Sequence, residues 1–187
     1  MAVAGKADPA AFFVGILVAD AECLRLANSV LEREFGIAAD CLPARPFGFT
    51  DYYERELGAH PLRAFLAYGT DFPPDRLAGR KLLTNRIEEE LAARAETPFP
   101  RPVNLDPGYL APDKLVLASA KDFSHRVYLS DGIYAEVTLQ YSGGRFQSLP
   151  WTFPDYGSGE YDGFFLRMRE RLMRDRRARR RHDAESA

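Results

Sequence analysis

The chain has 187 residues, of which 46% are hydrophobic and 12% aromatic, and it carries a formal net charge of −2. This length and composition predict one globular domain and exclude intrinsic disorder. No apolar run approaches the roughly 20 residues that a membrane span requires, and the first residues lack the order of a signal peptide. Cys23 and Cys41 show neither metal-binding spacing nor enough thiols for a disulfide framework, so we expect a reduced, cytoplasmic protein.

The first half of the chain alternates strand and helix patterns. Residues 12–18 are apolar apart from one glycine, which is typical of a strand buried on both faces. Asp20 can cap a helix that Gly36 ends. A short or edge strand near 42–49, an apolar run at 62–68 and a long helix from Pro73–Pro74 to about Arg94 follow.

After residue 100 the hydrophobic period changes from 3.6 to 2, which indicates antiparallel strands. We expect strands at 114–120, 124–129, 133–141 and 145–149, and a closing helix from about Glu160. Asp106-Pro107-Gly108 has the residue order of a tight turn, with proline at its second position and glycine at its third. Taken alone, this motif predicts a turn before the first of these strands.

The register of the hairpin follows from its two faces. A two-residue turn would set apolar residues opposite polar ones, whereas a three-residue loop with Gly132 left-handed separates the faces. The three-residue loop therefore predicts these pairs: Leu129 with Ile133, Val127 with Ala135, His125 with Val137, Tyr128 with Tyr134 and Arg126 with Glu136.

This order of elements predicts the α+β class, with a mainly antiparallel sheet and three main helices. A ferredoxin-like βαββαβ core would be extended by a β meander. We expect one domain over residues 1–173 and a basic, flexible tail over residues 174–187.

The charge of the C-terminal part differs from that of the rest. Residues 164–182 hold nine arginines against Glu170 and Asp175, which is +7, so the preceding residues are acidic. Such a run either binds nucleic-acid phosphates or forms the solvated end of a helix. The second interpretation is favoured, because no aromatic residue lies among these arginines to stack on a base.

Several catalytic signatures are absent from the sequence, among them a phosphate loop, a dinucleotide fingerprint, a nucleophile elbow and zinc-ligand spacing. What remains is a set of polar groups at the ends of elements. Lys81, Asn85 and Glu88 share one helical arc beside the apolar stripe, which fits either a surface network or a row that faces a ligand.

The polar groups around the hairpin also allow two interpretations. His125 can exchange a proton near neutral pH, which fits a catalytic residue, but the expected register directs it to the same face as Val127 and Leu129, which fits a histidine of the core equally well. Arg126 and Glu136 fit a cross-strand ion pair as well as a site. The carboxylates of the segment 50–54 could hold Mg²⁺ together with Glu88 or Asp106, or they could cap a helix.

Six motifs together resemble the bacterial domain of unknown function 4416 family. They are FGFTDYYE (47–54), KLLTNRIE (81–88), VNLDPGYL (103–110), KLVLASAKDFSHRVYL (114–129), DGIYAEVTL (131–139) and PWTFPDY (150–156). The resemblance covers about residues 12–171 and implies a shared architecture without an established activity. The arginine-rich end lies beyond it.

We therefore expect a site for a small anionic ligand, phosphorylated or carboxylated, in an enzyme or a binding protein. The candidate catalytic residues are Glu88, Asp106 and His125. The candidate ligand-binding residues are Lys81, Asn85, Tyr109, Lys114, Lys121, Arg126 and Glu136. The alternative is a non-enzymatic adaptor or nucleic-acid-associated protein that uses the arginine-rich tail.

Overall fold

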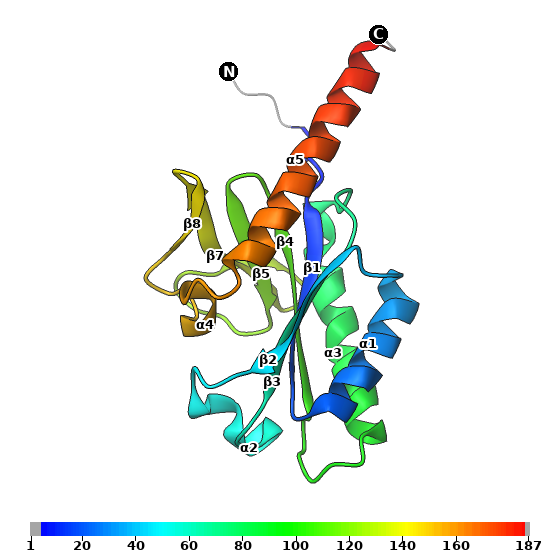
Figure 1. Ribbon diagram of the computed structural model, residues 1–187, viewed down its shortest axis with the longest axis vertical. Helices are drawn as coiled ribbons and strands as arrows, with labels where there is room; N and C mark the ends of the chain where they lie inside the picture. The colour runs from blue at the N-terminus through cyan, green and yellow to red at the C-terminus, as the bar shows by residue number, and fades with distance from the viewer. Residues whose placement is uncertain (1–4, 186–187) are drawn as a thin grey trace.

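An antiparallel sheet of eight strands organises the computed structural model of this chain, which describes residues 5–185 (Figure 1). The strands are β1 (Ala11–Val18), β2 (Asp40–Pro46), β3 (Leu62–Ala67), β4 (Val103–Leu110), β5 (Lys114–Ser119), β6 (Val127–Ser130), β7 (Ile133–Ser142) and β8 (Arg145–Ser148). Their order is β2-β3-β1-β4-β5-β7-β6, and β8 pairs with β7 beside β6.

Helices cover both faces of this sheet. They are α1 (Ala21–Phe35), α2 (Glu54–Leu57), α3 (Leu77–Arg94), α4 (Pro154–Gly157) and α5 (Asp162–Glu185), with 3-10 turns η1 (Asp51–Tyr53) and η2 (Pro74–Arg76). The longer helices α1 and α3 lie on one face and α5 on the other, so β1 is buried on both sides (Figure 1).

The first four strands and two long helices form the expected ferredoxin-like core. The order β2-β3-β1-β4 is antiparallel throughout, and α1 and α3 connect its strands across one face. Asp20 caps α1 by accepting a 2.8 Å hydrogen bond from the Cys23 amide, and Gly36 follows the helix with φ +81°. The predicted α+β fold with three main helices is confirmed.

The last strand of this core is β4, which the sequence predicted as a turn. Asp106, Pro107 and Gly108 all lie inside β4, and the pairing with β1 runs unbroken from Val103 to Leu110. The backbone N–H and C=O of Leu105 point away from β1, toward α3. Pro107 shares that direction because it lies two residues further on, so its missing N–H removes no bond to β1.

The sheet opens along β4. Strand β5 pairs with β4 only at residues 108–110, so residues 103–107 of β4 have no strand on that side. The opening begins at Pro107, which cannot donate to a neighbouring strand. At Gly108, where the pairing with β5 begins, β4 packs closely against its neighbours. A Cβ atom there would lie 2.6 Å from Phe13 Cζ and 2.6 Å from the Val116 carbonyl oxygen.

The hairpin β6–β7 agrees with the predicted register only in part. Val127 pairs with Ala135 and Tyr128 with Tyr134, as expected. Ser130 pairs with Ile133, however, so the loop has two residues, Asp131 and Gly132, both with positive φ, and Leu129 is a bulge. The predicted three-residue loop and the Leu129–Ile133 pair are wrong, because the bulge absorbs the extra residue.

Residues 174–185, which belong to the predicted basic tail, form the last part of α5, which ends at Glu185. Its upper part extends beyond the sheet (Figure 1). Within residues 5–185, no helix is both long and apolar enough to cross a membrane. Both cysteines are free, Cys23 in the core and Cys41 on the surface.

Replacing Gly108 by alanine should weaken the fold, because the new methyl group overlaps Phe13 and the β5 backbone. We expect a loss of about 1–3 kcal/mol in the free energy of unfolding, measured by urea denaturation. The control is Gly79→Ala in α3, where nothing lies within 4 Å of the added Cβ. It should stabilise the protein by about 0.5–1 kcal/mol. Equal effects of the two changes would contradict the close approach at Gly108.

Candidate functional site

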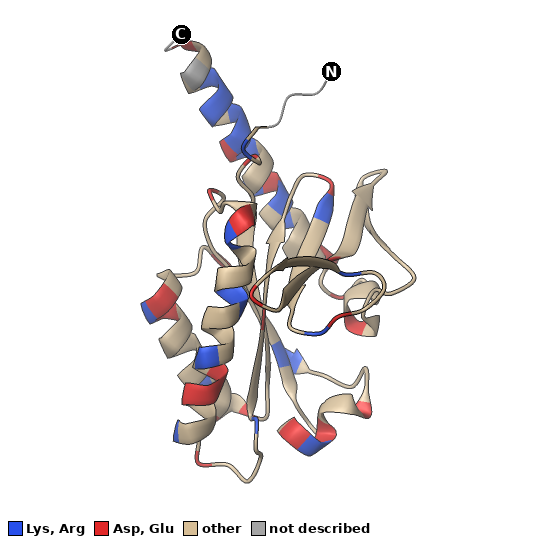
Figure 2. Cartoon of the chain, turned by 180° about the vertical axis from the view of Figure 1, so that it is seen from behind, with Lys and Arg blue, Asp and Glu red and all other residues tan. Residues whose placement is uncertain are grey.

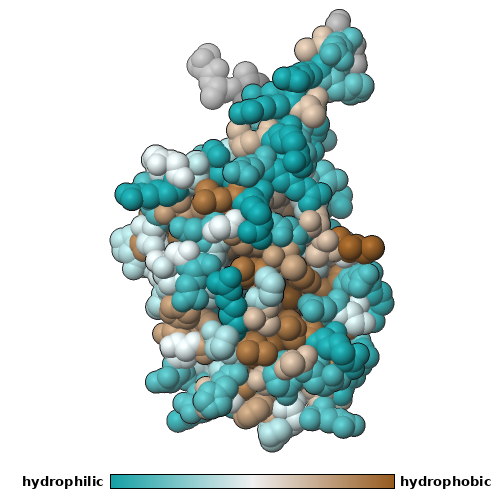
Figure 3. Space-filling model, viewed as in Figure 1, coloured by the Kyte–Doolittle hydropathy of each residue, from teal (hydrophilic) through white to brown (hydrophobic). Residues whose placement is uncertain are grey.

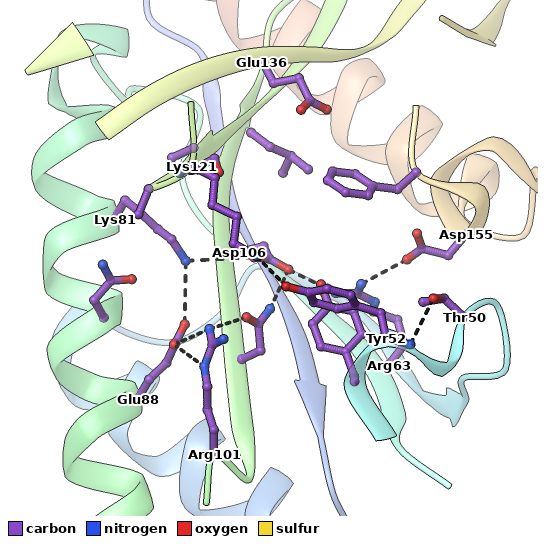
Figure 4. A pocket seen from close by; sticks show the side chains of 18 of the residues that line it. Thr50, Tyr52, Arg63, Lys81, Glu88, Arg101, Asp106, Lys121, Glu136 and Asp155 are labelled. Carbon is purple, nitrogen blue, oxygen red and sulfur yellow. Dashed lines mark hydrogen bonds and ion pairs between the residues drawn. The ribbon is translucent and has the colours of Figure 1, made fainter. Parts of the chain in front are cut away.

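A cavity of about 930 Å³ lies where the sheet opens. Its walls are α3, the free side of β4, the loop between β5 and β6, the segment around η1, and the start of α4 (Figure 4). Because these elements come from both faces of the sheet, side chains far apart in sequence meet around one space.

Two side chains of α3 replace the missing neighbour of β4. The Lys81 ammonium donates a 2.7 Å hydrogen bond to the Leu105 carbonyl oxygen, and the Leu105 N–H donates a 2.8 Å bond to Glu88 Oε1. Lys81 and Glu88 are two helical turns apart on one face, which matches this task. Both are buried and lie 3.6 Å apart. They therefore satisfy backbone groups that would otherwise be unpaired.

From Glu88 the polar contacts continue along β4. Arg101 donates to Glu88 at 2.8 Å and also lies 3.2 Å from Glu56 on α2. The same guanidinium donates to the Asn104 amide oxygen, and the Asn104 amide donates to Asp106 at 2.8 Å. This chain of contacts fixes the position of the Asp106 carboxylate at the centre of the cavity floor.

Asp106 lies between two cations. Its oxygens are 3.5 Å from Arg63 on β3 and 3.9 Å from Lys81 (Figure 4). Arg63 also binds Asp155 at 3.0 Å, and both of those side chains are 4% exposed. Burial raises the pKa of Asp155, although Arg63 acts against this. Burial works to lower the pKa of Arg63, but Tyr156, Asp155 and Asp106 raise it overall, so the guanidinium stays charged.

A second polar cluster forms the opposite wall. Glu136 on β7, whose side chain is 1% exposed, accepts a 2.9 Å bond from Arg126, and Arg126 also donates to Ser119 at 2.7 Å. His125 Nε2 lies 3.1 Å from Glu136. The imidazole ring stacks between Phe123 and Trp151. His125 itself does not line the cavity but contacts the lining residue Glu136.

The mouth of the cavity is bridged by one contact. The Lys121 ammonium lies 2.6 Å from the Tyr52 hydroxyl and 4.9 Å from the centre of its ring (Figure 4). Lys121 follows β5, whereas Tyr52 belongs to η1, so the contact joins two separate segments. Among the described cations that line the cavity, Lys121 alone has no carboxylate within 4 Å.

The structure brings most of the candidate residues together. Seven of them line the cavity: Lys81, Asn85, Glu88, Asp106, Lys121, Arg126 and Glu136. His125 is adjacent to it through Glu136. Tyr109 instead packs toward Phe72 among the side chains under α1 and α3. Lys114, at the other end of β5, lies 3.7 Å from Asp113. Neither Tyr109 nor Lys114 reaches the cavity.

Sequence reasoning missed several lining residues. Arg63, Arg101, Asp155 and Tyr156 were not among the candidates. A signal was present for Arg63, since it is the one charged residue in the apolar run 62–68. Such a residue must find a partner when its strand is buried. Asp155 offered no comparable signal, because its partner is distant in sequence.

The carboxylates of the cavity form ion pairs with lysine and arginine side chains and are not grouped as a metal-binding site. Among residues 5–185, no group of three or more His, Cys, Asp or Glu side chains is arranged to hold a metal ion. Of the two interpretations of the carboxylates in segment 50–54, a metal-binding group with Glu88 or Asp106 is therefore not found among the described residues. Glu88, Asp106, Glu136 and Asp155 each contact Lys or Arg.

Comparison with protein families matches residues 8–172 to a domain of unknown function, DUF4416. The chain belongs to this family, and the match contains every residue of the cavity. Neither the comparison with curated proteins nor the one with solved structures found a match.

Replacing Glu88 by alanine should destabilise the fold strongly. The change leaves the Leu105 N–H without an acceptor, and it takes a carboxylate from the buried Lys81. We expect a loss of about 3–5 kcal/mol in unfolding free energy, measured by urea denaturation. Glu89→Ala removes the next, exposed residue and should stay within about 0.5 kcal/mol of the wild type. A similarly mild effect at Glu88 would contradict its role at the β4 edge.

Proposed function

We propose that the cavity binds a small organic anion, phosphorylated or carboxylated, and that Lys121 is its principal anchor. The observation that carries this proposal is the absence of a carboxylate near Lys121 in a cavity where the other cations have one. A paired cation gains little from an added anion, because its charge is already compensated. The Lys121 ammonium contacts the neutral Tyr52 hydroxyl, which leaves its charge uncompensated, so an added anion gains a charge-assisted contact there.

The size and lining of the cavity support a ligand with a carbon framework. A volume of about 930 Å³ lies within the range of cavities that hold small molecules. Aromatic side chains also line the cavity: Phe49, Tyr52, Phe123 and Phe153. They would cover the apolar or planar part of the ligand, while its anionic group contacts Lys121.

For an enzyme, Asp106 is the best placed of the three proposed catalytic residues to exchange a proton. Its side chain is 24% exposed, so a bound molecule could reach it, whereas that of Glu88 is 8% exposed and engaged with β4. His125 would act only through Glu136. Asp106 would then be a general acid or base, a role that requires contact with the reacting group. A cytoplasmic location, expected from the two free cysteines, belongs to the same proposal.

A thermal-shift screen tests the proposal with inorganic phosphate, a nucleoside monophosphate, a sugar phosphate and a dicarboxylate. A ligand at 100 times its dissociation constant stabilises the native state by about 2.7 kcal/mol. For a domain of this size, the melting midpoint then rises by roughly 5–10 °C. Lys121→Ala should abolish the shift that the best anion produces.

Lys114→Ala is the matched control, because it removes a lysine that lies outside the cavity. It should leave the ligand-induced shift unchanged. Lys121→Ala should melt near the wild type without ligand, since Lys121 is exposed and makes no ion pair within 4 Å with any described residue. A shift that survives in Lys121→Ala would remove Lys121 as the anchor, and no shift with any of the four anions would contradict the proposed ligand class.

A further inference from the structure

The outer face of α5 carries a row of arginines that the cavity does not use. Its members are three or four residues apart, which sets them on one side of the helix: Arg171, Arg174, Arg177 and Arg181. We call this set the outer arginine row. At 1.5 Å per residue it is about 15 Å long. In Figure 2, this part of α5 is mostly blue, the colour of Lys and Arg, and extends beyond the body of the protein.

The opposite face of α5 is tied to the body, which fixes the direction of the row. Arg176 lies 3.2 Å from Asp8 and donates to the Pro9 carbonyl oxygen, and Arg179 donates to the Thr70 carbonyl oxygen at 3.0 Å. The Thr70 hydroxyl donates to Asp175 at 2.7 Å. These contacts hold the extended helix against the domain, so Arg174, Arg177 and Arg181 of the outer arginine row face solvent, whereas Arg171 is half-buried.

The outer half of the row has no ion-pair partners among the described residues. Arg174, Arg177 and Arg181 are exposed, and among the described residues neither Arg177 nor Arg181 forms an ion pair within 4 Å. The Arg174 side chain is 73% exposed and lies 3.5 Å from its neighbour Asp175. Like charges at this spacing destabilise a helix. A polyanion along the row would remove that repulsion and gain charge-assisted contacts.

A second feature points in the same direction. A cavity of about 400 Å³ lies beside α5 at the inner end of the row, and Arg167, Arg171 and Arg174 line it together with Thr70. Arg167 is already paired with Asp40 at 2.8 Å. Arg171 forms no ion pair within 4 Å among the described residues, and the exposed Arg174 contacts only its neighbour Asp175, so we expect both to be available to an anionic group. The row thus begins at a recess and continues along the exposed helix.

The composition of the C-terminal part of α5 indicates which kind of partner it could bind. Residues 174–185 contain no large apolar side chain, and this end of α5 is hydrophilic in Figure 3. A membrane-binding helix needs an apolar face, and a stable protein interface needs an apolar or aromatic centre. Arginine alone suits phosphodiesters, which its planar fork binds through two hydrogen bonds. Without an aromatic side chain, single-stranded bases have nothing to stack on.

We infer that the outer arginine row binds the phosphate backbone of double-stranded nucleic acid without sequence preference. An α-helix fits the major groove of a duplex, which is about 12 Å wide, so phosphates on either side come within reach of the row. The family match ends at residue 172, so most of the row lies beyond it. This activity is independent of the ligand proposed for the cavity.

Duplex binding by the full chain tests the inference. The probe is a fluorescent DNA duplex of roughly 20 base pairs, two helical turns, and its anisotropy is measured as salt is varied. Four phosphate contacts predict a slope of log K against log salt near −3.6, about −0.9 for each contact. The triple variant Arg174→Gln/Arg177→Gln/Arg181→Gln should reduce the size of this slope by about 3 and weaken binding at least about tenfold at low salt.

The control carries the same change in net charge elsewhere. Arg25→Gln/Arg33→Gln/Arg94→Gln removes three arginines of α1 and α3 whose side chains are at least half exposed. It should keep nearly the wild-type slope. Circular dichroism should show the α5 variant to be as helical as the wild type. The inference would be overturned if the full chain did not bind the duplex near 50 mM salt, or if both triple variants lost the same amount of duplex affinity. It would also be overturned if the α5 triple variant lost only self-association, measured by sedimentation without DNA.

Discussion

The rest of the site depends on how the backbone of Leu105 is satisfied. A strand inside a sheet normally finds its hydrogen-bond partners in two neighbouring strands, and β4 lacks one of them over residues 103–107. Lys81 and Glu88 supply the missing donor and acceptor from α3. A buried N–H and C=O left without hydrogen-bond partners would cost several kcal/mol in folding free energy. Because two side chains bear this role, β5 can diverge and leave a cavity within a continuous fold.

This arrangement also explains why so many charged groups can be buried together. Every buried charge of the cavity floor has a partner, through the contacts of Glu88 with Arg101 and of Arg63 with Asp106 and Asp155. Replacing a single member leaves another charge unpaired, so such networks resist stepwise change. Lys121 differs because it lies at the surface, where its removal breaks no buried pair. If the proposed site is correct, structural and binding roles are divided between the floor and the mouth of the cavity.

The sequence predicted those parts of the fold that local pattern determines. Helix α1 was found through its Asp20 cap, and α3 through its apolar period, which also located Lys81, Asn85 and Glu88 on the arc that lines the cavity. Strand β4 was missed, because the turn preference of Asp106-Pro107-Gly108 is a local signal. Its partners β1 and α3 are distant in sequence, and tertiary pairing overrode that preference. Arg63 and Asp155 meet across a separation that no local pattern encodes.

The proposed anion site and the outer arginine row use positive charge in opposite ways. In the cavity, carboxylates neutralise the other lining cations, so the proposed anion would be selected by shape and by Lys121, which has no carboxylate within 4 Å among the described residues. Along α5, the charges of Arg177 and Arg181 have no ion-pair partner within 4 Å among the described residues, and contacts on the far side of the helix hold them at fixed spacing. A regular array of this kind suits a polymer with evenly spaced phosphates. Since α5 packs on the same sheet whose opening forms the cavity, the helix would keep the cavity at a constant position relative to a bound duplex.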